Sequence, residues 1–293
     1  MTVEVESKPL AATTLPSTKR KAPYYLRVDS SAQGINFAEL WDYREALYHL
    51  LVRDIKLRYR QTILGALWAV LRPLITMVVF TVFFNTVAQV SSDGLPYPVF
   101  SFAALVPWTL FSDGIGMAAD SLVGQAHLVR KVYFPRLYIP LGRIFGGVID
   151  YGLSLIVLVG LAFAFGLRPS LAAVWVIPLL TLLILGLTVG VSLWFSALNV
   201  RYRDVRYLVP FMLQIWMFAS PVIYPASKID ESLRVLYSIN PMVVVIEGFR
   251  SVLLGGDAPT LAMVAVAVAV TAVILTTGML FFHRAEGVFA DVI

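Results

Sequence analysis

The side chains that could take part in catalysis are few and far apart in this sequence. The three histidines, His49, His127 and His283, are separated by long stretches of chain. The sequence has no GxxxxGK[ST] phosphate-binding loop and no HExxH zinc motif. It also has no cysteine, which excludes disulfides and thiolate metal sites. The sequence therefore predicts a protein without a catalytic, ATP-hydrolysing or metal site of its own.

The elements that must position these side chains are membrane helices. Hydrophobic residues make up 59% of the 293 residues and charged residues 14%, whereas soluble domains carry about 25% charged residues. A spanning helix requires roughly 20 consecutive, mostly apolar residues. The predicted fold is therefore an all-α integral membrane protein with six transmembrane helices. The segments that meet the length requirement are 61–90, 97–124, 137–166, 171–199, 205–226 and 258–282.

Cations beside the first apolar segment determine the predicted orientation. Arg53, Lys56, Arg58 and Arg60 end just before it, and cations that flank a span are retained on the cytoplasmic side. With this orientation, most of the 23 Lys and Arg residues lie in inside segments. We expect a multi-pass protein of the plasma (inner) membrane, with both termini in the cytoplasm and no nucleic-acid partner. The outside segments contain only Arg168, Lys228, Arg234 and Arg250.

Three acids, Asp113, Asp120 and Asp150, lie toward the cytoplasmic halves of the second and third predicted spans. A proton-coupled carrier typically places carboxylates near the membrane midplane. We expect these three carboxylates to pair with Arg143 or with helix ends instead. This pattern disfavours an ion channel or a secondary carrier.

The segment before the first span is expected to form an amphipathic helix at 34–57. Its apolar side chains recur at three- and four-residue steps from Phe37 through Trp41 to Ile55. Such a helix beside a span lies in the plane of the cytoplasmic interface, and a soluble helix packed on a partner protein is the alternative. The other predicted domains are a disordered cytoplasmic tail at 1–33, a six-span transmembrane domain at 58–285 and a cytoplasmic C-terminal tail at 286–293.

Two loops within the transmembrane domain have unusual compositions. The second cytoplasmic loop, 125–137, combines cations with aromatic residues, which favours contact with another protein; a topology signal with interfacial aromatic anchors is the alternative. The outside segment 225–257 contains an apolar stretch too short for a span, in which Glu247 and Arg250 can pair on one helix face. We expect a re-entrant helical hairpin before the last span that could lid an outward opening. A plain amphipathic loop is the alternative.

Several stretches of the sequence resemble, in order, the membrane subunits of ABC transporters that export polysaccharides. They are LRYRQTILGALWAVLRP, LVRKVYFPR, NVRYRDVRYLVPF, SPVIYP, and INPM followed by EGFRSVLLGG. The similarity covers about residues 36–285. It implies a homodimer of this chain with two separate ATPase subunits, which would bind ATP and Mg, and no cofactor on this chain. The missing phosphate loop agrees with this division.

The resemblance also implies roles for the two unusual loops. The 225–257 hairpin would gate the external mouth of the channel through Asn240, Glu247 and Arg250. The second cytoplasmic loop would be a coupling helix that seats in a cleft of the ATPase. Its residues would be His127, Leu128, Val129, Arg130, Lys131, Val132, Tyr133 and Phe134.

The implied cargo is a lipid-linked polysaccharide such as O-antigen, capsule, teichoic acid or a cell-wall galactan. Spans one and five would line its channel, where sugars can stack on aromatic rings. The candidate channel-lining residues are Trp68, Phe80, Phe83, Phe84, Phe211, Gln214, Trp216, Phe218 and Tyr224. A cytoplasmic entrance, with arginines for a lipid diphosphate, would comprise Phe37, Trp41, Arg58, Arg60, Arg201, Arg203 and Arg206. The alternatives are aromatics that face lipid or pack, and arginines that serve as orientation signals.

Two other functions compete with polysaccharide export. An ABC permease for a drug or small lipid would turn fewer aromatics toward the pore, and hydrophobic small molecules would stimulate its ATPase. A membrane-embedded glycosyl or phosphosugar transferase would need clustered acids on a cytoplasmic loop to hold a metal. The cytoplasmic loops offer only Asp204 as a central acid, which favours export.

Overall fold

The computed structural model describes residues 41–59, 65, 67–131, 134–287 and 289. Within these residues the chain is helical and has no strand. Five helices are long and apolar enough to cross a membrane, which confirms an all-helical membrane protein. They are Leu67–Val87 (α3 continued by the π-helical turn η1), α4 (Tyr97–Ala119), α7 (Tyr138–Ala164), α8 (Ala173–Arg201) and α12 (Leu261–Glu286).

The predicted fifth span is shorter than expected. The helix α9 covers only Val205–Phe218, which is 14 residues. At 1.5 Å per residue it is about 21 Å long, less than the roughly 30 Å of a hydrocarbon core. The predicted segment ran on to residue 226, but Pro221 and Pro225 lack the N–H that a continuing helix requires.

The segment after α9 forms a bent helix pair. It contains the short 3₁₀ turn η2 (Ala226–Lys228), α10 (Glu231–Tyr237) and α11 (Pro241–Leu254). The axes of α10 and α11 differ by 114°, as expected of a broken span or a re-entrant loop. If this pair counts as one span, the described chain has up to six.

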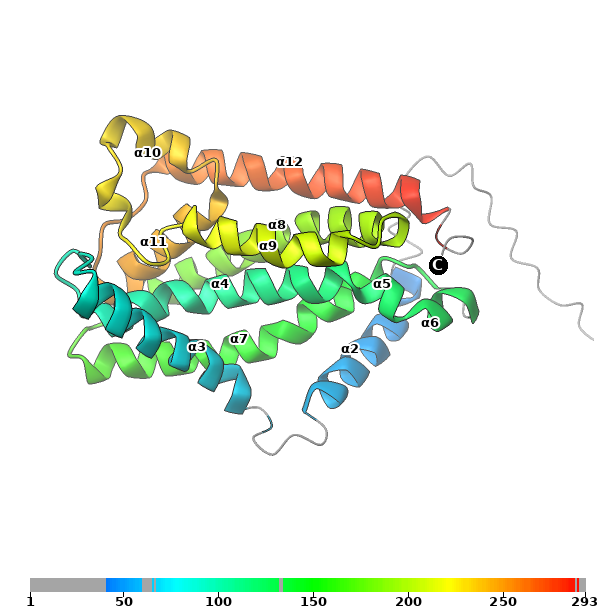
Figure 1. Ribbon diagram of the computed structural model, residues 1–293, viewed down its shortest axis with the longest axis horizontal. Coiled ribbons are helices and arrows are strands. Elements are labelled where there is room, and N and C mark those ends of the chain that lie inside the picture. The colour runs from blue at the N-terminus through cyan, green and yellow to red at the C-terminus, as the bar shows by residue number, and fades with distance from the viewer. Residues whose placement is uncertain (1–40, 60–64, 66, 132–133, 288, 290–293) are drawn as a thin grey trace, which may run out of the picture. The chain divides into compact units, whose positions relative to one another are not determined.

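The helix α4 forms the centre of the bundle. It contacts α3, α7, α8, α9 and α11, and most of its side chains are buried. By contrast, Pro73 is the only fully buried residue of α3, and α9 buries only Val205 and Val209. Figure 1 shows α9 running beside α4, and α3 slanting away from α4 across α7. Their open faces must therefore meet lipid, water or another protein.

The helices α8 and α12 cross at backbone contact distance because both carry glycine there. A Cβ atom added at Gly190 would lie 2.7 Å from the backbone nitrogen of Leu275, and one added at Gly278 would overlap the carbonyl oxygen of Gly190. Small residues allow such close approach between membrane helices. The sequence spacing Gly186-x-x-x-Gly190 places a second glycine on the same face, near Thr271.

The short helices gather at the two ends of the bundle. Figure 1 shows α2 (Arg44–Tyr59), α5 (Ser121–Gly124) and α6 (Ala126–Lys131) near the end at which α12 finishes. A hydrogen bond from Arg136 to Glu286, the last residue of α12, agrees with this placement. At the opposite end, Ser227 donates to Asp93 at 3.0 Å, joining the η1–α4 loop to η2.

Substitution at the glycine crossing should destabilise the bundle. Gly278→Ala places a methyl group against backbone that cannot move aside, and we expect a loss of about 1–3 kcal/mol. Gly160→Ala in α7 is the control, because nothing lies within 4 Å of its added Cβ. This control should stabilise by about 0.5–1 kcal/mol through helix propensity. Thermal unfolding of the purified protein in detergent measures both, and equal midpoints would contradict the crossing.

Candidate functional site

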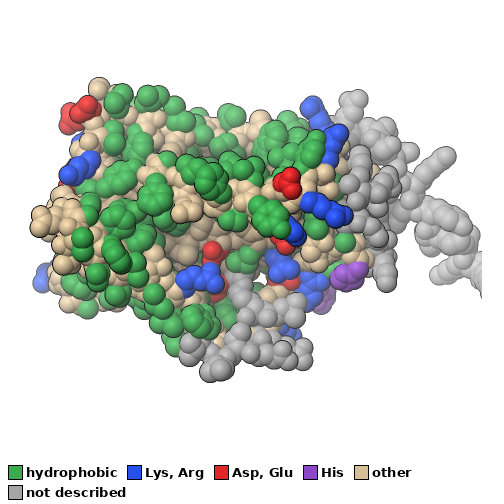
Figure 2. Space-filling model, viewed as in Figure 1, with side chains coloured by type: hydrophobic (Ala, Val, Ile, Leu, Met, Phe, Trp, Pro, Cys, Tyr) green, Lys and Arg blue, Asp and Glu red, His purple; other side chains and the backbone are tan. Residues whose placement is uncertain are grey.

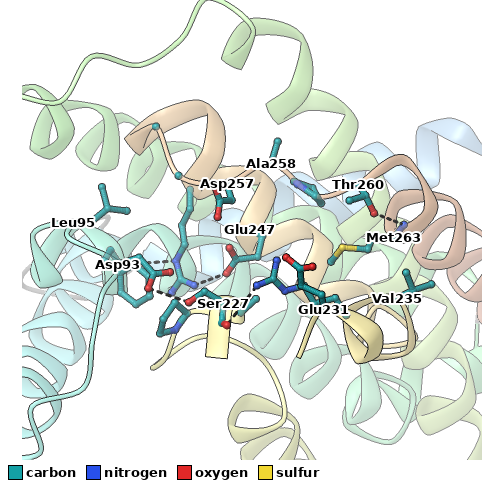
Figure 3. A pocket seen from close by; sticks show the side chains of 18 residues that line it. Asp93, Leu95, Ser227, Glu231, Val235, Glu247, Asp257, Ala258, Thr260 and Met263 are labelled. Atoms are coloured by element: carbon teal, nitrogen blue, oxygen red, sulfur yellow. Dashed lines mark hydrogen bonds and ion pairs between the residues drawn. The ribbon is translucent and has the colours of Figure 1, made fainter. Parts of the chain in front are cut away.

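A cavity of about 730 Å³ lies at the end of the bundle that contains α10. Its walls come from the loop before α4, from η2 and α10, from α11 and from the segment 255–260. Four carboxylates from different segments line it, namely those of Asp93, Glu231, Glu247 and Asp257 (Figure 3). We call this space the outer cavity.

A buried arginine forms the inner wall of the outer cavity. Only 2% of the Arg250 side chain is exposed, and its Nη1 donates to Glu247 Oε1 at 2.8 Å. Nη2 donates to the carbonyl oxygen of Val222 at 3.2 Å, and Nε to that of Phe100 at 3.4 Å. The guanidinium also lies 3.5 Å from the centre of the Phe100 ring. The predicted Glu247–Arg250 pair is confirmed, and Arg250 joins α11 to α4 and to the segment after α9.

The third proposed gate residue, Asn240, ties the end of α9 to the start of α11. Its Oδ1 caps α11 by accepting from the Met242 N–H at 3.2 Å, and also accepts from Trp216 Nε1 at 2.9 Å. Its Nδ2 donates to Ser220 Oγ at 2.8 Å. The Trp216 ring packs edge-on against Phe111 of α4, with centroids 4.9 Å apart. Residues 216–240 are therefore held by side chains as well as by backbone.

The predicted channel-lining residues fall into two groups. The first group is exposed on the open faces of α3, η1 and α9, and it contains Trp68, Phe83, Phe211, Gln214 and Phe218. The second group is half-buried against the central core, and it contains Phe80, Phe84, Trp216 and Tyr224. Their role as a channel lining stays a prediction.

The predicted entrance residues that the structure describes are all exposed. Trp41 is 70% exposed, and Arg201, Arg203 and Arg206 surround the turn between α8 and α9. Figure 2 shows hydrophobic side chains over most of the visible face, with Lys and Arg concentrated toward one end. Phe37, Arg60 and the side chain of Arg58 lie outside the described residues.

The predicted coupling residues lie on α6 and the loop after it. His127 is exposed, whereas Leu128 packs against the core and Phe134 is buried in it. Val132 and Tyr133 lie outside the described residues, as do the side chains of Val129, Arg130 and Lys131. Leu128 and Phe134 therefore pack this segment against the bundle.

A cluster of polar side chains connects α2, the α5–α6 turn and α7. The Asp54 carboxylate is 4% exposed, and it pairs with Arg53 at 3.0 Å and with Arg143 of α7 at 3.4 Å. Arg53 also donates to Gln125 Oε1 at 2.6 Å, and Gln125 is buried between α5 and α6. We call these four residues the inner cluster. Sequence reasoning missed it because its partners lie far apart in the chain and no local pattern marks Asp54 as buried.

The acids of the second and third spans have partners other than Arg143. Asp113 pairs with Arg72 at 3.1 Å, Asp120 lies 3.4 Å from Asn199 Nδ2, and Asp150 accepts from Tyr59. We expected these acids to pair with Arg143 or with helix ends. The Arg143 part was wrong, because α2 packs against α7 and places the Asp54 carboxylate 3.4 Å from Arg143. Asp120, by contrast, does lie at a helix end, between α4 and α5.

The helix α2 divides its apolar residues between two faces. Leu47 and Leu50 pack on the core near α7, and Gly142 of α7 leaves room for Leu50, whose Cβ is 3.8 Å from an added methyl group. On the other side of α2, Tyr48 is 64% exposed, and Trp41, just before α2, is 70% exposed. One face thus holds the helix on the bundle and the other is free to meet a second surface.

Several helices long and apolar enough to cross a membrane, packed in one bundle, define an integral membrane protein with multiple spans. The model of the ABC-2 type transporter family matches residues 45–254 of this chain. The chain therefore belongs to that family of membrane transport proteins. Within the described residues, no group of three or more acidic or histidine side chains could hold a metal ion.

Two kinds of named relative share most of the chain. The O-antigen export system permease protein RfbA of Myxococcus xanthus is 32% identical over 255 residues, which cover 86% of this chain and 97% of the relative. The protein of the same name from Klebsiella pneumoniae is 30% identical over 253 residues, which cover 84% of this chain and 96% of the relative. The polysialic acid transport protein KpsM of Escherichia coli is 21% identical over 207 residues, which cover 71% of this chain and 80% of the relative.

Removal of Arg250 should destabilise the end of the bundle that contains α10. Arg250→Met leaves a half-buried carboxylate and two carbonyls without their donor, and we expect a loss of about 3–5 kcal/mol. Because an apolar replacement of both charged partners is nearly neutral, Arg250→Met with Glu247→Leu should recover the part of the loss that comes from the unpaired carboxylate. The part that comes from the carbonyls of Val222 and Phe100 should remain. The exposed Arg168→Met at the same end is the control and should change stability by less than about 0.5 kcal/mol. Unfolding midpoints in detergent that are equal for Arg250→Met and Arg168→Met would contradict the interpretation.

Loss of the Asp54 charge should loosen α2 from α7. Asp54→Asn keeps the shape of the side chain but weakens two charged contacts, and we expect a local cost of about 2 kcal/mol. Hydrogen exchange of amides in 44–59 should quicken, whereas the exposed Asp42→Asn should leave it unchanged. Equal exchange in both variants would show that the inner cluster does not hold the helix.

Proposed function

We propose that this chain is the membrane-spanning subunit of an ATP-driven exporter that moves a lipid-linked polysaccharide out of the cytoplasm. The observation that carries this proposal is the similarity to O-antigen export permeases over 84–86% of the chain and 96–97% of their length. The weaker similarity to a polysialic acid transport protein extends it to a second class of glycan. The cargo would be an O-antigen, capsule, teichoic acid or cell-wall glycan.

The proposed assembly is a homodimer with two copies of a nucleotide-binding subunit, which supplies ATP and Mg. The coupling residues 127–134, which begin within α6, would seat in a cleft of that ATPase. The inner cluster supports this assignment because it links the α5–α6 turn to α2 and α7 through Gln125, Arg53 and Asp54. Movement of the ATPase could then reach α3, which follows α2 in the chain.

The proposed topology places α2, α6 and the end of α12 on the cytoplasmic side of the plasma membrane. The distribution of Lys and Arg supports this orientation, and the α8–α9 turn carries the exposed Arg201, Arg203 and Arg206. The exposed rings of Trp41 and Tyr48 suit the headgroup region, where Trp and Tyr are enriched. We therefore propose that α2 lies in the membrane interface.

The pair α10–α11 would be a re-entrant hairpin at the outer mouth of the channel. Its 114° bend and the polar outer cavity beside it support this role, because irregular backbone within a membrane requires protein or water around it. Arg250 and Asn240 would hold the hairpin to α4 and α9 in the closed state. The open faces of α3 and α9, with their aromatic residues, would line the channel between two copies of the chain.

Depletion of the chain in its native cell tests the proposed cargo. We expect one lipid-linked glycan to accumulate on the cytoplasmic side of the plasma membrane and to disappear from the surface, because no other step could carry it across. Chemical analysis of the glycans on each side measures this, and re-expression of the chain should restore the surface glycan.

The opposite result would name another cargo. An unchanged glycan distribution, together with greater sensitivity to small hydrophobic compounds, would contradict polysaccharide export and favour an exporter of drugs or small lipids. Depletion of an unrelated permease in the same cell controls for general damage to the membrane.

A further inference from the structure

A second cavity, of about 600 Å³, lies between α3, α4 and α7. Its polar lining includes Arg72, Asp113, Arg143 and Asp150, and Trp68 stands among the lining residues at the start of α3. Its volume falls within the range of about 300–1,000 Å³ that ligand sites occupy. Trp68 is the one predicted channel-lining residue among its described lining residues. We call this space the lateral cavity.

The charges in the lateral cavity indicate that it contains water. Arg72 and Asp113 form an ion pair at 3.1 Å, yet the two side chains are 67% and 41% exposed. Both residues lie within helices apolar enough to span the membrane. Exposure of such a pair to hydrocarbon is costly, and membrane proteins therefore turn charged residues toward cavities or other protein. The face of α3 and α4 that carries this pair should accordingly be wet.

The balance of charge among the described residues of the lateral cavity favours a neutral ligand. Of the lining residues that the structure describes, two arginines, Arg72 and Arg143, are matched by two carboxylates, Asp113 and Asp150. A site for a free anion would require an excess of positive charge. Paired guanidinium and carboxylate groups instead offer donors and acceptors together, because an arginine has five N–H donors and a carboxylate about four acceptor positions. Such a lining suits a ligand with many hydroxyl groups.

The indole ring of Trp68 adds an apolar surface to the lining for such a ligand. Trp68 is 49% exposed, so about half of its surface remains available for contact with a ligand. A sugar presents hydroxyls at its edge and C–H groups on its face, and an amphipathic ring beside polar groups matches both. Further hydroxyls, those of Thr109 and Ser154, lie among the lining residues.

We propose that the lateral cavity is a hydrated binding site for a neutral sugar unit of the exported glycan. The inference rests on the proposed function and deepens it by naming where the carbohydrate first meets the protein. The site lies beside the start of α3 and is distinct from the outer cavity at the other end of the bundle. The sugar stacks on Trp68 while its hydroxyls bond to Arg72 and Asp113.

Thiol labelling tests whether the cavity is wet. The chain has no cysteine, so a single introduced thiol is the only one that can react. Ala69→Cys and Thr109→Cys lie in the cavity, whereas Ile156→Cys and Leu182→Cys replace exposed apolar residues elsewhere on the bundle. In native membranes with the complete transporter, a membrane-impermeant maleimide should label the cavity positions faster, on the order of tenfold or more, because the reactive thiolate forms in water. Equal rates at all four positions, as expected if lipid or a second copy fills the cavity, would overturn the proposal.

Protection from labelling tests the ligand. The probes are the oligosaccharide released by mild acid from the lipid-linked glycan of the producing cell, and inorganic diphosphate. We expect the oligosaccharide to slow the labelling of Ala69→Cys and diphosphate to leave it unchanged. Protection by diphosphate alone would overturn the sugar site in favour of an anion site, and protection by neither would also overturn it.

A second substitution in the Ala69→Cys background identifies the aromatic contact. Trp68→Ala should remove most of the protection, whereas Leu67→Ala, at the exposed neighbouring residue, should keep it. Equal protection in both variants would contradict stacking on Trp68. The depletion experiment gives its answer independently: export lost without labelling of the cavity refutes this inference alone, and an unchanged glycan distribution refutes the proposed function.

Discussion

Removing an unpaired charge from water costs several kcal/mol, and this chain places charges at three depths of an apolar bundle. At one end Arg250 pairs with Glu247, along the spans Arg72 pairs with Asp113, and at the other end Asp54 pairs with Arg143. Two of these pairs join helices that are distant in sequence. The need to satisfy each charge therefore also determines which helices lie together.

The bundle has a tightly packed centre and a looser outside. Buried α4 contacts most of the long helices, and the glycine contact between α8 and α12 leaves no space for adjustment. The helices α3 and α9 add few buried residues and depend on what covers their open faces. This division suits a transport subunit, because α3 and α9 can shift against other surfaces while the packed centre around α4 stays fixed.

Polar groups at the two ends of the bundle suit different tasks. At the α10 end, Arg250 and Asn240 hold backbone carbonyls and helix ends in place, so their side chains are occupied with the fold. At the other end, the exposed arginines around the α8–α9 turn have open space before them. The lateral cavity combines both features, since its ion pair is formed and yet exposed. Such a site can bind a polar ligand without creating an unpaired charge when the ligand leaves.

The sequence by itself determined the class of the protein, because long apolar segments with few charges dictate membrane helices. The orientation that the clustered cations indicate stays a prediction. The sequence also determined the Glu247–Arg250 pair, since a spacing of three residues on one helix leaves little else to decide. Only the tertiary structure decided that Arg143 meets Asp54 and that the predicted aromatics divide into open and packed groups. These features depend on contacts between segments far apart in the chain, for which local periodicity carries no signal. Hydrophobicity fixes where helices exist, whereas the pairing of buried charges and the close approach of glycines fix which of them meet.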